Sequence, residues 1–88
     1  MPELSFDRAM KVKVLFFGAT AEAAGIHSQE FEVSDGVRSR EIFDRVLGEY
    51  PSLSSHKLLF SVNQEYANGS ETVKDNDELA VFTAVSGG

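Results

Sequence analysis

Apolar and polar residues alternate in several stretches of this chain. Successive side chains of a β-strand point to opposite faces of the sheet, so alternation predicts a strand with one face in the core. The four clearest strands are predicted at residues 11–17, 29–33, 57–63 and 78–83. A further run, residues 71–74, comes just before an acidic turn at 75–77 and predicts a short extra strand.

One segment has helical spacing instead. After Ser39, which is a good N-cap residue, apolar side chains recur every three or four positions, and Pro51 ends the helix after Tyr50. A shorter run, residues 19–24, predicts one or two helical turns closed by Gly25. The predicted core combines the helix stripe with the inward side of the strands: Val12, Val14, Phe16, Phe31, Val33, Ile42, Phe43, Val46, Leu47, Leu58, Phe60, Val62, Leu79 and Val81.

The order of these elements is strand, strand, helix, strand, short strand, strand. One long helix can cover only one face of one sheet, which predicts an α+β roll with a mixed sheet of about five strands. The order and the length fit the β-grasp, the fold of ubiquitin. We predict a loose leader at residues 1–9, the folded domain at 10–83 and a flexible tail at 84–88.

Composition narrows the possible functions. The 88 residues include no cysteine and carry a formal net charge of −6. The absence of cysteine excludes a thiol nucleophile, a disulfide or a cysteine metal site within this chain. The negative net charge argues against nucleic acid as a partner. His27 and His56 lack neighbouring ligands and are interpreted as solvated, so no metal site is predicted. No apolar run or signal pattern indicates a membrane, which predicts a cytoplasmic, cytosolic protein.

With one helix, the other face of the sheet is left uncovered. Its predicted side chains include large apolar residues, and a contiguous exposed patch of this kind usually marks a contact surface. The sequence therefore predicts a protein partner, unless loops cover some of these residues. The role of residues 63–66 stays open between turn geometry and recognition. The predicted interface comprises Phe17, Leu59, Tyr66 and Phe82, with Leu15 beside them.

The last residues are the second candidate for function. Val85-Ser86-Gly87-Gly88 follows the final strand, and glycine suits a terminus that threads a narrow channel or lies flat on another backbone. The one reactive group there is the terminal carboxylate, which is ionised at neutral pH and able to attack a nucleotide phosphate. The alternative is an idle terminus, as many are.

Four segments of the chain carry a family resemblance: KVKVLFF at 11–17, VNQE at 62–65, DELA at 77–80 and VSGG at 85–88. Together they resemble the MoaD family, the small sulfur-carrier subunits of molybdopterin synthase, over about residues 10–88. A terminal Gly-Gly alone is shared with the thiamine carrier ThiS and with ubiquitin-like modifiers.

The resemblance implies that a MoeB-like enzyme uses ATP to adenylate Gly88. Sulfur from a donor then replaces AMP as a thiocarboxylate, and no cofactor is bound permanently. It also implies that the loaded tail inserts into a MoaE-like large subunit, within a heterotetramer, and gives its sulfur to cyclic pyranopterin monophosphate. The chain is then a sulfur-donating subunit that is not catalytic alone. The tail comprises Thr83, Ala84, Val85, Ser86 and Gly87 ahead of Gly88.

Two positions depart from the family pattern. Thr83 and Ala84 stand where the family usually has two prolines, which implies a less stiff tail. Ala21-Glu22 stands where many members have Arg-Glu, which puts a partner contact there in doubt. The alternatives are a ThiS-type carrier for thiamine synthesis, a ubiquitin-like protein modifier, and a binding module whose tail is idle.

Overall fold

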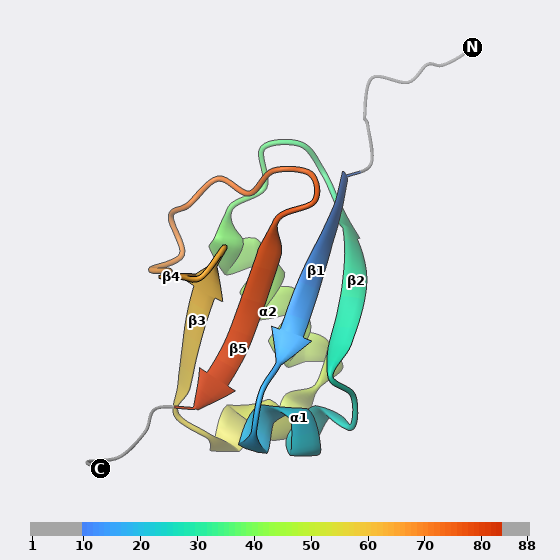
Figure 1. Ribbon diagram of the computed structural model, residues 1–88, viewed down its shortest axis with the longest axis vertical. Helices are drawn as coiled ribbons and strands as arrows, with labels where there is room; N and C mark the ends of the chain where they lie inside the picture. Colours follow the sequence, from blue (N-terminus) through green and yellow to red (C-terminus); the bar gives the residue numbers. More distant parts are fainter. Residues whose placement is uncertain (1–9, 84–88) are drawn as a thin grey trace.

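The computed structural model describes residues 10–83, which form one mixed sheet with the long helix behind it and a shorter helix at one end (Figure 1). The predicted α+β architecture, with five strands and one main helix, is confirmed. Its elements in chain order are β1 (Met10–Phe16), α1 (Ala19–Ala24), β2 (Ser28–Val33), α2 (Ser39–Glu49), the 3₁₀ helix η1 (Pro51–Ser55), β3 (Leu58–Val62), β4 (Glu65–Tyr66) and β5 (Glu78–Thr83).

The strand order is β2-β1-β5-β3-β4. The first and last strands lie side by side in the middle and run parallel, with Val14 opposite Leu79 and Phe16 opposite Val81 (Figure 1). All other neighbouring pairs are antiparallel. The alternation in β1 is reproduced as alternating buried and more exposed positions, so the pattern predicted the correct face.

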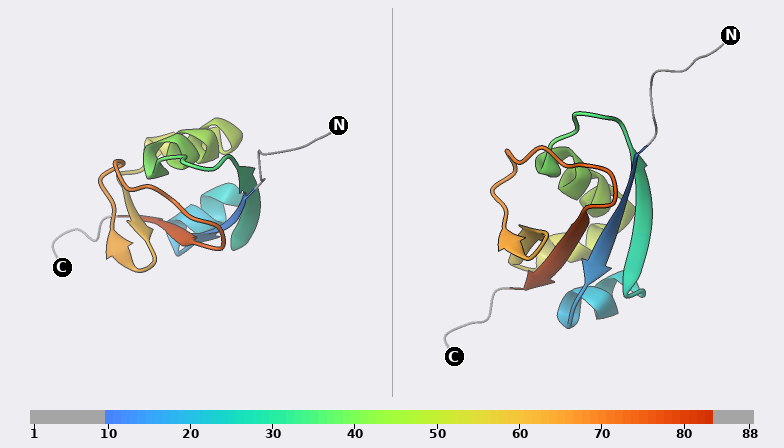
Figure 2. Two further views of the ribbon diagram at one scale, coloured as in Figure 1. Left: turned by 90° about the horizontal axis from the view of Figure 1, so that it is seen from above. Right: turned by 45° about the horizontal axis from the view of Figure 1, so that its top comes forward.

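α2 lies across one face of the sheet, and the other face carries no helix (Figure 2). Its apolar stripe packs on the inward side chains of the strands, and the ring of Phe43 stacks on that of Phe60 with 3.9 Å between centroids. Full burial of one such side chain contributes ~1.5–3 kcal/mol. The buried core consists of Met10, Val12, Val14, Phe16, Phe31, Val33, Ile42, Phe43, Val46, Leu53, Val73, Leu79 and Val81.

The prediction that Ser39 caps α2 is wrong. Arg38 is the N-cap residue and makes no side-chain cap, and Ser39 is the first helical residue. The helix start is capped from elsewhere in the chain, because the backbone N–H groups of Ser39 and Arg40 donate to the carbonyls of Glu71 and Gly69, at 2.8 and 3.1 Å. The Ser39 hydroxyl is fully buried and donates to Glu71 at 2.6 Å.

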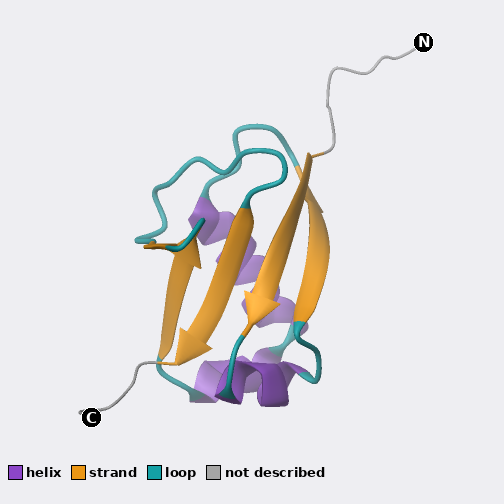
Figure 3. Ribbon diagram, in the orientation of Figure 1, coloured by secondary structure: helices purple, strands orange, loops and turns teal. Residues whose placement is uncertain are grey.

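The predicted strand at 71–74 is also wrong. In that segment only Thr72 makes an isolated bridge, to Arg38, and the short strand is β4 instead (Figure 3). β3 and β4 are joined by a two-residue turn in which Asn63 and Gln64 have φ values of 50° and 72°. Positive φ at both turn residues is the geometry of a tight hairpin, so residues 63–66 have a clear structural role.

Two smaller features differ from expectation. The predicted polar connection after Pro51 is the 3₁₀ helix η1, and its Leu53 is fully buried. Ser61 points to the helix-free face but is only 8% exposed, because Ala80 and Tyr66 flank it on the two neighbouring strands. Pro51 follows the end of α2 as predicted, and Gly25 closes α1 in the left-handed conformation at φ 81°.

Candidate functional site: the apolar face beside the end of β5

The helix-free face of the sheet carries a group of large apolar side chains. The register places Leu15, Ala80, Ser61 and Tyr66 in one row across four strands. In the next row Leu59 lies opposite Phe82. We call the group of Leu15, Phe17, Leu59, Tyr66 and Phe82 the apolar face.

The predicted interface residues are brought together but differ in exposure. Tyr66 is 76% exposed and Phe17 51%, and these are the exposed large apolar residues among residues 10–83. Leu15, Leu59 and Phe82 are half-buried. The ring centroids of Tyr66 and Phe82 lie 6.0 Å apart. Side chains on one surface with this much accessible apolar area are suited to a protein contact.

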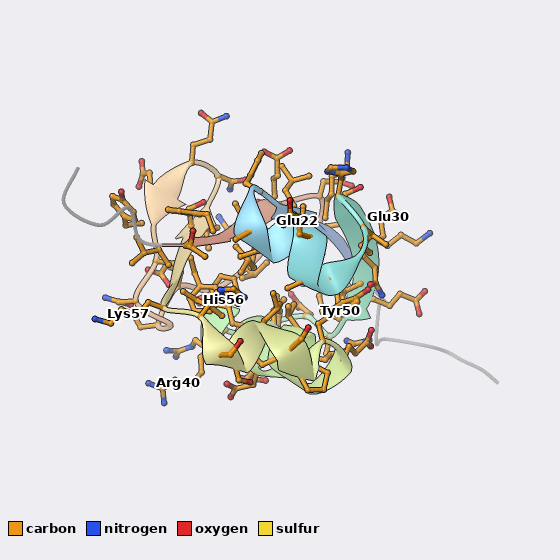
Figure 4. The ribbon with its side chains drawn as sticks, turned by 90° about the horizontal axis from the view of Figure 1, so that it is seen from below. Glu22, Glu30, Arg40, Tyr50, His56 and Lys57 are labelled. Carbon is orange, nitrogen blue, oxygen red and sulfur yellow. The ribbon has the colours of Figure 1, made fainter. Side chains whose placement is uncertain are left out.

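The apolar face lies at the end of the sheet where β1 and β5 finish, which we call the tail end. Thr83, predicted as tail, is the last residue of β5 and pairs with Leu58. Figure 4 looks onto this end and shows Lys57, which precedes β3, extending away from the ribbon. The other predicted tail residues, Ala84, Val85, Ser86, Gly87 and Gly88, lie outside the described residues, as does the predicted leader.

A buried hydroxyl lies beneath this end of the sheet. Thr20, in α1, has no exposed surface, and its single hydroxyl proton lies between two acceptors, the carbonyls of Phe17 and Val81, at 2.7 and 2.8 Å from Oγ1. The same oxygen accepts from the backbone N–H of Phe17 at 2.9 Å. One side chain thereby connects β1, α1 and β5. The sequence analysis assigned Thr20 only to a helical turn, because its bond to Val81 joins residues 61 positions apart.

The opposite end of the sheet, which we call the anchor end, is held by polar side chains. The carboxylate of Glu71 accepts from the Ser39 hydroxyl and from the backbone N–H groups of Asn68 and Gly69. These bonds, with that from Ser39 as the strongest, stabilise the charged form and lower the pKa of Glu71 to about 2. Glu71 thus fixes the 68–71 segment against the start of α2.

Asn63 fixes the start of β5 at the same end. Its Oδ1 accepts from the backbone N–H of Glu78, and its Nδ2 donates to Asp77, both at 3.0 Å. Asp77 also accepts from the backbone N–H of Lys74 at 2.8 Å. The acidic stretch at 75–77 is therefore a turn, as predicted.

Tyr50 connects the helical layer to β2. Its ring meets Phe16 edge to face, with 5.4 Å between centroids, and its hydroxyl donates to Gln29. Burial, followed by the charge of Glu49, raises the pKa of Tyr50. Tyr50 directly follows the end of α2 (Figure 4) and packs partly buried against the core, so we assign it to packing.

Neither a metal-binding group nor a membrane-spanning helix is found among the described residues. His27 and His56 are both exposed. Within residues 10–83 no group of three His, Cys, Asp or Glu side chains is placed to hold a metal ion. None of the helices in this range has the length and apolar character needed to cross a membrane.

The chain was compared with known families and proteins. The model of the ThiS family matches residues 14–88. The molybdopterin synthase sulfur carrier subunit of Chlamydomonas reinhardtii is 36% identical over 83 residues, which cover 90% of this chain and 100% of that protein. These two matches agree with the resemblance carried by the four segments.

Solved structures agree on the fold. Small archaeal modifier protein 1 of Haloferax volcanii has a TM-score of 0.78 at 27% identity, over 89% of this chain and 99% of that one. A chain from the complex of subunits 1 and 2 of the Helicobacter pylori molybdopterin-converting factor has a TM-score of 0.65 at 21% identity, over 90% of this chain and 100% of that one. The β-grasp fold is confirmed. The chain belongs to the ThiS family and, within it, to the MoaD-type sulfur carriers.

Proposed function

We propose that this chain is the sulfur-carrier subunit of a molybdopterin synthase. The observation that carries the proposal is the position of the apolar face, which surrounds the last residues of β5, five residues before Gly88. A partner that covers this face also meets the end of β5. The same partner could thereby bind the apolar face and receive the terminal carboxylate.

The chemistry belongs to the terminal carboxylate. Its oxygen attacks the α-phosphate of ATP and displaces pyrophosphate, which gives an acyl-adenylate on Gly88. Sulfur from a donor then replaces AMP, and the product is a thiocarboxylate. The chain contains no cysteine, and the side-chain hydrogen bonds of residues 10–83 join no hydroxyl to a histidine, which fits a carrier whose catalytic side chains come from partners.

Two partners follow from this reaction. A MoeB-like enzyme adenylates Gly88, and a MoaE-like large subunit accepts the tail and transfers the sulfur to cyclic pyranopterin monophosphate. The Helicobacter pylori chain that shares this fold was solved as a complex of two subunits of molybdopterin-converting factor, which supports a partner of the second kind. The net charge of −6 suits a partner with a basic contact surface.

The proposal is tested by intact-mass spectrometry of the full chain after incubation with ATP, a MoeB-like enzyme and a sulfur donor. Replacement of one carboxyl oxygen by sulfur is expected, with a mass gain of about 16 Da, the difference between the two elements. Addition of a MoaE-like subunit and the pterin precursor should then return the carboxylate and yield molybdopterin.

Three other results would contradict the proposal. A ladder of isopeptide-linked products would indicate a protein modifier, and stable association only with a thiazole synthase would indicate a carrier for thiamine. No change of mass would indicate a tail without a role in sulfur transfer. The matched control omits ATP, because an acyl-adenylate cannot form without it.

A further inference from the structure

We propose that the Thr20 hydroxyl is a positioning group that holds the apolar face and the end of β5 as one rigid docking unit. This inference rests on the proposed function, since it concerns how the carrier is presented to its partners. Thr20 itself is fully buried and touches no partner. It acts through Phe17 and Val81.

The geometry of the hydroxyl supports this role. Phe17 is half-exposed and belongs to the apolar face, and it follows directly on the last residue of β1. Its N–H and carbonyl both bond to Thr20 Oγ1, at 2.9 and 2.7 Å. The Val81 carbonyl bonds to the same oxygen at 2.8 Å, and Val81 immediately precedes Phe82. One atom thereby contacts the interface residue Phe17 and the residue before Phe82, and it adds to the backbone bond that joins the two strands there.

The backbone beside Phe17 has one flexible point. Gly18 separates Phe17 from α1 and has a φ of 57°, and α1 begins without a side-chain cap. Glycine readily changes conformation, so the backbone dihedrals at this junction are only weakly restricted by residue type. The buried Thr20 hydroxyl adds side-chain hydrogen bonds to the backbone bonds that already hold Phe17.

Loss of the hydroxyl should affect position more than folding. Without it, the Phe17 N–H still donates to the Val81 carbonyl at 3.3 Å, and the Phe17 carbonyl still accepts from the Thr20 N–H at 3.1 Å. Each of these backbone groups therefore keeps a hydrogen-bond partner. A buried substitution is severe when it leaves a donor or acceptor without one, and that is not the case here. Thr20→Val keeps the shape of the side chain and removes only the hydroxyl.

Ser39 provides a matched control. It too carries a fully buried hydroxyl, which bonds to Glu71 at the anchor end. Ser39→Ala therefore removes a buried hydroxyl without disturbing the apolar face. Thr20→Ser keeps the hydroxyl of Thr20 and tests for rescue.

The experiment measures affinity for the MoaE-like subunit by calorimetry, and KM and kcat for sulfur loading by the MoeB-like enzyme. It uses full-length chains at a temperature where circular dichroism shows each to be folded. For Thr20→Val we expect affinity about five- to tenfold weaker, which corresponds to the net contribution of one hydrogen bond. KM should rise with kcat unchanged, because docking geometry is altered and the chemistry is not. Thr20→Ser and Ser39→Ala should both bind like the wild type.

The positioning role is overturned if Thr20→Val binds and loads like the wild type, or if Ser39→Ala weakens binding as much. Should Thr20→Val fail to fold, Thr20→Ala takes its place with the same expected and contradicting results. Failure of the proposed function looks different, because then the wild-type chain itself is not loaded with sulfur.

Discussion

The two ends of β5 are held by different kinds of interaction. At the anchor end, Asn63 and Asp77 bond to the backbone around the first residue of β5, and Glu71 fastens the segment before it to α2. At the tail end, Phe82 is half-buried on an open face and one buried hydroxyl, that of Thr20, bonds to the strand.

This difference separates stability from recognition. Side-chain bonds to backbone groups specify one arrangement of the chain, because they require a defined geometry of donor and acceptor. Exposed apolar side chains contribute little to the isolated fold but gain free energy when a partner removes them from water. Substitutions at the anchor end should therefore change unfolding, and substitutions at the tail end should change function.

The largest effect is expected beyond β5. One residue appended after Gly88 should abolish sulfur loading, because the reacting carboxylate is moved to another residue and further along the chain. The midpoint of urea unfolding should stay the same, since the addition lies outside the sheet. Intact-mass spectrometry measures loading and circular dichroism measures unfolding. Retained sulfur transfer in this variant would remove the role proposed for Gly88.

The second largest effect is expected for Phe82→Asp. A charge at the centre of the apolar face should weaken binding to the MoaE-like subunit about a hundredfold, as at other interface hot spots. Stability should fall by less than about 1 kcal/mol, because Phe82 is half-buried on the helix-free face. Calorimetric titration measures the affinity and urea unfolding the stability.

Thr72→Asp is the matched control, because it places the same charge on an exposed residue at the anchor end. It should leave the affinity unchanged. Gross unfolding of Phe82→Asp would show that the two faces of β5 are reversed.

The third effect is confined to stability. Glu71→Gln should lower the urea midpoint at pH 7, because the pKa of Glu71 lies at about 2, below its usual 4.5, and the charged form is therefore favoured by folding. This contribution is fully present above about pH 4.5 and is lost as the pH falls towards 2. The variant should accordingly lose less stability than the wild type between these pH values.

Urea unfolding at pH 7 and pH 3 tests this, with the exposed Glu41→Gln on α2 as the control. Equal pH dependence in the wild type and Glu71→Gln would rule out the network around Glu71 as a source of acid sensitivity. Affinity for the MoaE-like subunit should not change in either variant.

The smallest effect is expected between the two ends, in α2. Gly48 is exposed, and a Cβ added there meets no atom within 4 Å. Gly48→Ala should stabilise the fold by ~0.5–1 kcal/mol, since glycine is a poor helix residue. The control is Gly25→Ala, where the φ of 81° makes the same exchange unfavourable. A loss of stability at position 48 would contradict the assigned helix interior.

The fold followed from local pattern to a large extent. Alternation predicted β1, β2 and β5 with their buried faces, and the spacing of apolar residues predicted α2. β3 was also predicted, but Leu58, Phe60 and Val62 are only partly buried against the core. The wrong predictions, for Ser39 and for residues 71–74, concern a helix start that is capped by backbone groups about thirty positions away. Local propensity cannot reveal such a contact, because it depends only on neighbours in the sequence. Neither the start of α2 nor residues 69–71 carry a local signal that names the other as a partner.

The candidate site was likewise predicted only in part from the sequence. Phe17, Leu59 and Phe82 could be placed on one surface from strand periodicity, and Tyr66 was added because it comes just after a predicted strand. The structure places Leu59 opposite Phe82 and the Tyr66 ring beside that of Phe82. Thr20 could not be found, because its role depends on a carbonyl 61 positions later. A threonine three residues after a strand, beyond a glycine, was the one local signal.

The parallel pairing of β1 with β5 also determines when this protein can fold during synthesis. Residues such as Val14 and Leu79 are neighbours in the centre of the sheet, so its middle cannot form until the last strand has left the ribosome. Chains that end prematurely lack this central strand and are expected to be cleared by proteases as unfolded polypeptide. Molecules that survive this selection already possess the strand that leads to the reactive terminus.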